Sequence, residues 1–316
     1  MNNKGNCLYL LGAGASCEVL PLVSNFVEKL NGFATKLSDY INDVIHVEQE
    51  DYIKLGNELL VDTKWLARES DSHYSVDTFA KKLYFIDDDE NLHKLKTVLS
   101  VYLVIEQSRT RVDKRYDAFL ASVLSKGQSV TLPEHLRILT WNYDRQLDKA
   151  MYGFCKNQKV KLREMKHHHI HAINGSCLEV EEIYNSENKP AWERGINLYK
   201  DCMDSHSEIS PQIDFAWEYN VKAWLNKDIN YFTQDVTDII VIGYSFPYFN
   251  RDIDTLLFNK CERQVERIYL QCGKQNDVVE ERLKACLRCR PGELINKNIK
   301  FNQITSVGLF FIPDNF

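Results

Sequence analysis

The sequence predicts an α/β protein with a Rossmann-like parallel sheet, helices on both faces of the sheet and a helical insertion lobe. Short apolar or β-branched segments alternate with segments whose apolar residues repeat at helical spacing. Such alternation favours a parallel sheet covered by helices on both faces. A helical stretch at about 36–130 separates the first two strands and is too long for a simple crossover. We therefore interpret 1–316 as one domain whose insertion forms a second lobe.

Each predicted strand leads into a glycine or polar turn. The candidate buried strands are Cys7–Leu11, Leu136–Thr140, Ile239–Ile242 and Arg267–Leu270, and the tail Lys300–Ile312 adds one or two strands. Ligands of parallel α/β sheets bind outside the carboxyl ends of the strands. The turns after these strands are therefore where we expect functional residues.

Helices are predicted where apolar residues recur every three or four positions. These segments are 21–30, 76–85, 92–103, 116–123 and 215–225. The polar segment Asn185–Ser210 is predicted to form surface loops and short helices.

The totals limit the functional class. The chain has 316 residues, a formal net charge of −6 and 44% hydrophobic residues, which is ordinary for a globular protein. The negative balance argues against nucleic-acid binding driven by bulk charge. We find no apolar run of bilayer length and no signal-peptide pattern. We therefore expect a cytoplasmic protein that does not bind a membrane.

Cysteines and histidines suggest metal binding only weakly. The 9 cysteines show no disulfide rhythm, and only Cys286 and Cys289 have metal-ligand spacing, whereas a structural zinc site needs four ligands. The run His167-His168-His169-Ile170-His171 lacks a nearby carboxylate. We therefore expect no metal, and we expect one histidine to act in acid–base or positioning work.

The first motif is the glycine turn Gly12-Ala13-Gly14-Ala15-Ser16. Glycine lacks the Cβ atom that would block a tight turn and a close ligand. The helical segment after it would offer unpaired N–H groups and a partial positive charge to an anion. The turn therefore suits a diphosphate, although alone it is a weak signal.

The second motif, Thr140-Trp141-Asn142-Tyr143-Asp144, follows the second strand. The amide of Asn142 could hold a ribose hydroxyl or a water in one orientation, and Asp144 could cap the next helix. Both are also ordinary turn and cap residues.

The third motif ends in Ile173-Asn174-Gly175-Ser176 and is predicted to be a short strand entering a glycine turn. The fourth, Ile240 to Ser245 followed by Asp252, is a strand ending in a glycine turn with a hydroxyl. Gly243 and Ser245 could contact a phosphate there, and a simple strand-to-loop joint is the alternative.

Together and in this order, the four motifs resemble the sirtuin-like superfamily, and more specifically the sirtuin-like NAD hydrolases of prokaryotic anti-phage defence. Val76–Leu83 also resembles a helix common among these defence proteins. The resemblance covers about 7–275. Each motif alone is weak, and the ordered set indicates the fold and NAD binding.

The resemblance implies a role for each matching residue. Gly12, Ala13 and Ser16, with Gly14 in the same turn, would line the diphosphate. Asn142 would lie beside the nicotinamide ribose, where the family asparagine is needed for activity, and Asp144 would support that loop. On the adenosine side the resemblance implies contacts from Gly243, Ser245 and Asp252. The implied reaction hydrolyses NAD+ to nicotinamide and ADP-ribose through a cation-like ribosyl centre, with NAD+ as substrate and no true cofactor.

One departure from the family affects the catalytic set. The family usually carries histidine immediately before the Gly-Ser pair, and this chain has Asn174 there. His171 lies three residues earlier, and a regular strand would point it to the opposite face. Asn174 could substitute as a hydrogen-bonding group, a bulge could bring His171 into the site, or the chain could bind NAD+ without cleaving it. We retain Asn142, His171 and Asn174 as catalytic candidates.

Other NAD-dependent classes fit less well. Sirtuin deacylases carry a zinc module with two Cys-x-x-Cys pairs, which this chain lacks. A dehydrogenase fingerprint needs glycine or alanine where Cys17 stands and an acidic residue about 20 residues past the turn.

We expect an NAD-depleting defence effector, with a catalytically weak nucleotide-binding or scaffold subunit as the alternative. The resemblance also suggests a homo-oligomer, with a separately encoded ATPase or helicase as a candidate partner. It does not distinguish NAD from NADP.

Overall fold

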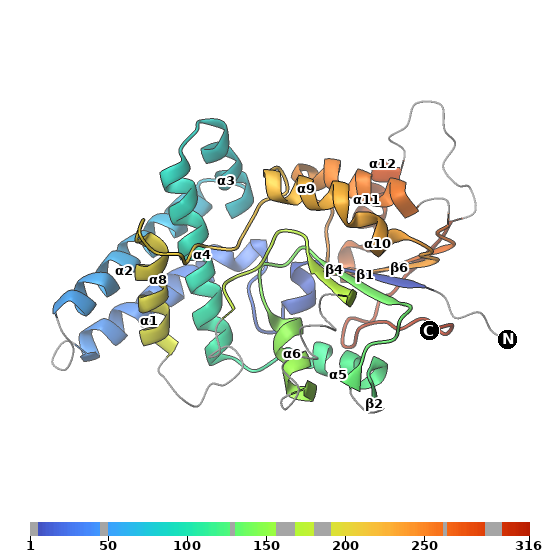
Figure 1. The fold of residues 1–316 in the computed structure, drawn as a ribbon, viewed down its shortest axis with the longest axis horizontal. Helices are drawn as coiled ribbons and strands as arrows, with labels where there is room; N and C mark the ends of the chain where they lie inside the picture. The colour runs from blue at the N-terminus through green and yellow to red at the C-terminus, as the bar shows by residue number, and fades with distance from the viewer. Residues whose placement is uncertain are drawn as a thin grey trace.

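The computed structural model describes residues 6–44, 50–126, 130–155, 168–179, 191–261, 264–287 and 299–316. At its centre lies a six-stranded parallel sheet (Figure 1). Its strands are β1 (Cys7–Leu11), β4 (Leu136–Thr140), β5 (Ile170–Ala172), β6 (Asp238–Ile242), β7 (Arg267–Gln271) and β8 (Lys300–Gln303). The tail thus supplies one strand to this sheet.

The strand order is β5-β4-β1-β6-β7-β8. Numbered along the chain these are the third, second, first, fourth, fifth and sixth strands of the sheet, which is the order of dinucleotide-binding doubly wound folds. The order reverses between β1 and β6, so the turns after these two strands flank the topological switch point. The predicted Rossmann-like α/β fold is confirmed.

Alternating side chains of the strands enter two cores, one on each face of the sheet. Cys7, Tyr9 and Leu11 pack with α5 (Lys114–Val123) and α6 (Gln146–Cys155). Leu8 and Leu10 belong to the core on the other face, together with side chains from α10 (Ile229–Thr233), α11 (Arg251–Cys261) and α12 (Asn276–Leu287). Figure 1 shows these two helical layers above and below the sheet, with α9 (Tyr219–Lys227) beside α11.

A group of longer helices forms a lobe beside the sheet, at the left of Figure 1. It consists of α1 (Phe26–Val44), α2 (Glu50–Asp71), α3 (Val76–Phe85), α4 (Asp89–Arg109) and α8 (Ala191–Met203). The first four precede β4 in the chain. Of these, α2, α3 and α4 lie within 36–130, the stretch expected to be an insertion, whereas α1 begins before it at Phe26. The small elements are η1 (Ala13–Ser16), η2 (Val23–Asn25), η4 (Tyr248–Asn250), η5 (Gly273–Gln275) and the hairpin β2 (Ser125–Lys126) and β3 (Val130–Thr131).

Three helix predictions differ from the structure. The helix expected from 21 begins at Phe26, because the Asn25 side chain accepts the Leu22 N–H and holds a separate turn. The helix expected from 215 begins at Tyr219, because Glu218 accepts the Phe215 N–H and closes a turn there.

The third difference lies in the polar segment 185–210. It contains the 13-residue helix α8, whose buried residues include Ile196 and Tyr199. These apolar positions repeat at helical spacing, but the charged residues on either side of them, at 193–194 and 200–201, hid the pattern. None of the helices among the described residues is both long and apolar enough to cross a membrane.

Candidate functional site

The glycine turns after β1 and β6 pack backbone against backbone at the switch point. A Cβ on Gly12 would lie 2.5 Å from the Tyr244 Cα, and one on Gly14 would lie 2.7 Å from the Gly243 Cα. Gly243 itself has a φ of +61°, and a Cβ there would lie 2.4 Å from Gly14 atoms. These glycines therefore allow the two turns to touch, which is a structural need separate from any ligand.

The backbone N–H groups of Gly12, Gly14 and Ala15 donate to backbone oxygens of the protein itself. Gly12 N–H donates to Ile242 O at 3.0 Å, Gly14 N–H to Gly243 O at 2.9 Å and Ala15 N–H to Gly12 O at 2.8 Å. The glycine turn is followed only by the short helix η1, which is a single turn. The partial positive charge expected from a long helix directly after the glycine turn is therefore absent at this position. Ala13 is exposed at the apex of this turn.

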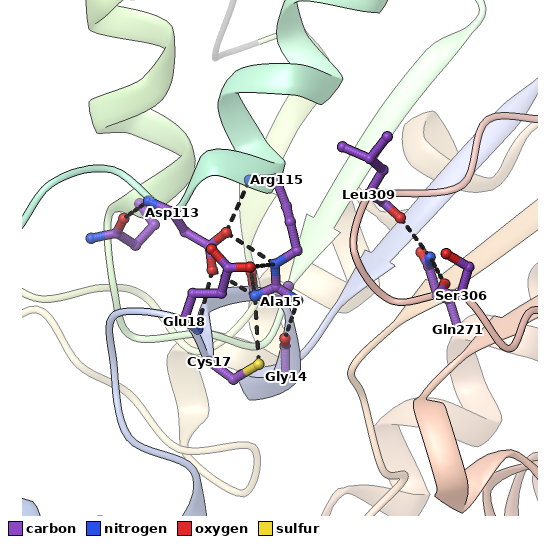
Figure 2. Close-up of polar contacts among 10 residues, drawn as sticks. Gly14, Ala15, Cys17, Glu18, Asp113, Arg115, Gln271, Ser306 and Leu309 are labelled. Carbon is purple, nitrogen blue, oxygen red and sulfur yellow. Dashed lines mark hydrogen bonds and ion pairs between the residues drawn. The ribbon is translucent and has the colours of Figure 1, made fainter.

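A buried arginine fixes the shape of the glycine turn (Figure 2). Arg115 donates from Nη1 to Gly14 O and from Nη2 to Ala15 O, both at 3.1 Å. Its charge is balanced by Asp113, which accepts from Nε at 3.0 Å and from Nη2 at 2.5 Å. Asp113 also accepts the Glu18 N–H. The start of α5 thereby clamps the turn that follows β1.

The chain end covers the same corner. Gln271, the last residue of β7, donates to Ser306 O at 2.6 Å and to Leu309 O at 2.7 Å (Figure 2). The held segment packs Phe310 edge-on against Tyr116, with ring centroids 4.9 Å apart. Segments far apart in sequence therefore close the core below the glycine turn.

The side chains of Ser16, Asn142 and Asp144 meet in one hydrogen-bonded network. The Asn142 Nδ2 donates to the Ser16 Oγ at 3.3 Å, and the Ser16 hydroxyl lies 3.1 Å from the Tyr116 hydroxyl. Ser16 also hydrogen-bonds Asp144. Asn142 N–H donates to the Thr140 Oγ1, which fixes the backbone of the β4 exit. The structure thus joins the first and second motifs directly.

Asp144 has an unusual environment for a carboxyl group. Burial raises its pKa to about 6, although the Gln146 N–H and the Ser16 hydroxyl favour the ionised form and offset part of that effect. Asp144 accepts the Gln146 N–H at 2.9 Å at the start of α6, as a helix cap does. At neutral pH this places a carboxylate one hydrogen bond from the Ser16 hydroxyl that Asn142 contacts.

His171 packs against the helices that follow the third motif. β5 pairs with β4 in regular register through Ala172, so no bulge redirects the side chain. The His171 ring stacks on Trp224 with centroids 3.7 Å apart and lies near Phe232. Burial lowers the pKa of His171 to about 4, so the ring is neutral at physiological pH. The contacts of His171 are those of a packed side chain.

Asn174 is held in a different way. Its Nδ2 donates to the Tyr143 hydroxyl at 3.4 Å, and that hydroxyl donates to the Asp77 Oδ1 at 2.5 Å. Asp77 lies in the first turn of α3, so the helical lobe reaches the sheet edge here. The Oδ1 of Asn174 is buried and has no hydrogen-bond partner among the described residues.

The fourth motif contributes mainly through its backbone and through Tyr244. Ser245 O accepts from Arg282 Nη1 at 2.9 Å. Tyr244 stacks on Trp141, with centroids 5.4 Å apart, and connects the β6 turn to the β4 exit. Asp252 is exposed on α11, whereas Asp254 is buried and accepts from the Tyr244 hydroxyl.

Sequence reasoning missed the residues that hold this site together. Arg115, Asp113, Tyr116 and Asp77 lie in the predicted helical stretch and were not connected to the strand ends. One signal was available in the sequence. Asp113 and Arg115 form a charged pair at the start of a predicted helix, and Asp113 is the N-cap of α5.

Among the described residues no group of three or more His, Cys, Asp or Glu side chains is arranged to hold a metal ion. His167 and Cys289 lie outside the described residues.

In comparisons with known proteins, neither a protein-family model nor a curated protein sequence matched this chain.

Proposed function

We propose that the protein binds NAD+ at the carboxyl edge of the sheet, around the switch point between β1 and β6, and hydrolyses the nicotinamide–ribose bond. The products would be nicotinamide and ADP-ribose. The observation that carries the proposal is the hydrogen bond from Asn142 to Ser16. It joins a glycine turn of the type that approaches diphosphates to an amide at the end of the next strand, where a ribose would lie.

The proposed chemistry needs a group that stabilises positive charge on the ribose. The nicotinamide–ribose bond breaks with cation-like character at the anomeric carbon. Asp144, whose pKa is raised by burial to about 6, is mainly ionised at pH 7 and is part of the network around Asn142. We assign Asn142 to holding the ribose or the attacking water, and Asp144 to stabilising the developing charge and orienting the Ser16 hydroxyl.

The packed position of His171 supports an assignment without a histidine base. Its ring lies against Trp224. Water can attack a cation-like centre without a strong base. We therefore assign the role of the third motif to the polar side chain of Asn174.

Nicotinamide release tests the proposal. Wild type should release nicotinamide from NAD+, and Asn142→Ala should lower the rate at least about 100-fold, as loss of a catalytic hydrogen-bonding group commonly does. Asn57→Ala is the matched control, because the Asn57 amide is exposed on α2 and bonds only its own helix. Equal inactivity of wild type and Asn142→Ala, with both folded, would reject the enzyme assignment.

A nucleotide-binding or scaffold subunit is the second candidate. It is favoured by the internal use of the Gly12, Gly14 and Ala15 N–H groups, which leaves fewer donors for a diphosphate. Calorimetric titration with ADP-ribose beside the release assay separates the two candidates. Tight binding without release would favour the subunit.

For the cellular role we propose an anti-phage effector that depletes NAD+, acting as a homo-oligomer with a separately encoded ATPase or helicase as a candidate partner. This role rests on the resemblance of the four motifs alone. Induced expression in a bacterial host, with the NAD+ pool measured during phage infection, should show depletion with wild type and none with Asn142→Ala.

A further inference from the structure

Two successive hydrogen bonds connect the side chains of Asp77, Tyr143 and Asn174, and the donor and acceptor of each bond are fixed. A tyrosine hydroxyl has one proton, and the 2.5 Å separation from the Asp77 Oδ1 indicates that this proton points to the carboxylate. The hydroxyl therefore offers only a lone pair to Asn174. The Asn174 amide must meet it with Nδ2, and its Oδ1 is turned the other way.

Two features of the surroundings of Asp77 oppose the effect of burial on its carboxylate. Burial raises the pKa of Asp77, and the hydrogen bond from Tyr143 opposes that shift. The carboxylate also lies in the first turn of α3, where the helix dipole stabilises negative charge.

The backbone of Asn174 is also held in place. Its carbonyl oxygen accepts the Asp214 N–H at 2.8 Å. The next residue, Gly175, has a φ of +63°, and a Cβ there would lie 2.0 Å from Gln212 O. The amide is thus fixed at its backbone and at Nδ2, which leaves a buried acceptor without a partner. A buried unpaired acceptor costs free energy and therefore calls for an explanation.

We propose that Asp77 and Tyr143 are positioning residues that present the Asn174 oxygen, and not its nitrogen, to a hydroxyl of the ribose that carries the scissile bond. This inference rests on the proposed function and adds a role for the helical lobe. An acceptor draws the hydroxyl's proton toward itself and leaves more electron density on the ribose. That interaction strengthens as positive charge develops, so it acts mainly in the transition state.

The variant Asp77→Leu should reverse the direction of these hydrogen bonds. Leucine offers no acceptor, so the Tyr143 proton turns to Asn174, and the Asn174 amide rotates to accept it through Oδ1 and to present Nδ2. A hydroxyl can still accept from that nitrogen, so substrate binding changes little. The turnover number for nicotinamide release should fall about tenfold or more, while KM stays within about threefold.

A double substitution supplies the rescue. In Asp77→Leu/Asn174→Asp, Tyr143 donates to the new carboxylate, whose second oxygen is an acceptor in either rotation. The double variant should recover at least about a third of the wild-type turnover number. Asp62→Leu is the matched control, because Asp62 accepts from the Tyr199 hydroxyl at 2.6 Å within the lobe. It should leave turnover unchanged.

The outcomes separate this inference from the proposed function. Absence of nicotinamide release by folded wild type overturns both. Normal release by wild type with Asp77→Leu behaving like wild type overturns the inference alone. The inference is also overturned if Asp77→Leu raises KM as much as it lowers turnover, or if the double variant stays as slow as the single one. A thermal melt of each variant shows that the compared proteins are folded.

Discussion

The ends of β4 and β5 lie side by side in the sheet and differ in how their polar side chains are satisfied. At β4, Asn142 and Asp144 share the Ser16 hydroxyl. At β5, the Asn174 amide is anchored on one side and leaves an acceptor unpaired, while His171 packs into the core. The first end is therefore held rigid by the protein itself, and the second keeps a free hydrogen-bonding group. The two neighbouring strand ends therefore differ in one observable way, which is the unpaired Asn174 oxygen at β5.

The largest expected effect comes from removing the clamp on the β1 turn. Arg115→Leu leaves the Asp113 carboxylate buried without its cation, and breaking a buried pair in this way costs about 3–5 kcal/mol. The free energy of unfolding, measured with urea, should fall by that amount. Arg68→Leu is the control, since its partner Glu69 lies beside it on the surface, and it should change stability by less than about 0.5 kcal/mol. Equal effects of the two variants would show that the clamp does not hold the turn.

The next effect distinguishes glycines by position. Gly243→Ala places a Cβ against the Gly14 backbone at a positive φ, so it should cost about 2 kcal/mol or more. Gly32→Ala meets no atom within 4 Å on the exposed face of α1 and should stabilise the protein by about 0.5–1 kcal/mol. Thermal melts should show a lower melting temperature for Gly243→Ala and a higher one for Gly32→Ala. A harmless Gly243→Ala would show that the two turns do not need to touch.

The strands and the glycine turns could be predicted because their signals are local. The apolar runs at 7–11 and 136–140 lead into turns, and the parallel order brings their ends together. That order also brings Ser16 and Asn142 to the same edge of the sheet, where the structure shows the hydrogen bond between them. Arg115 and Asp77 could not be connected to the site, because helices in a long insertion can pack in many ways and spacing alone does not choose among them. His171 was a candidate because of its residue type, and its packing on Trp224 depends on where α9 lies.

A smaller, pH-dependent effect is expected at the β4 end. Because the pKa of Asp144 is raised to about 6 by burial, above the value of about 3.9 expected in the unfolded chain, its favourable contribution is complete below about pH 4 and is lost as the pH rises through about 6. Relative to Asp144→Asn, wild type should therefore lose on the order of 1–2 kcal/mol between pH 4 and pH 7. Urea unfolding of both proteins across this pH range measures the difference in their free energies of unfolding. If that difference did not change with pH, the raised pKa of Asp144 would be contradicted.

The smallest effect is expected at the β5 end, with the opposite pH dependence. Burial lowers the pKa of His171 to about 4, below the value of about 6.5 in the unfolded chain. Its contribution is therefore complete above about pH 6.5 and is lost as the pH falls toward 4. His171→Phe keeps a ring against Trp224 and should match wild type within about 0.5 kcal/mol at pH 7. At pH 4.5 the variant should be more stable than wild type by on the order of 1 kcal/mol. If wild type instead gained stability relative to His171→Phe on acidification, the ring would be charged in the folded protein and the packed, neutral role assigned to it would be wrong.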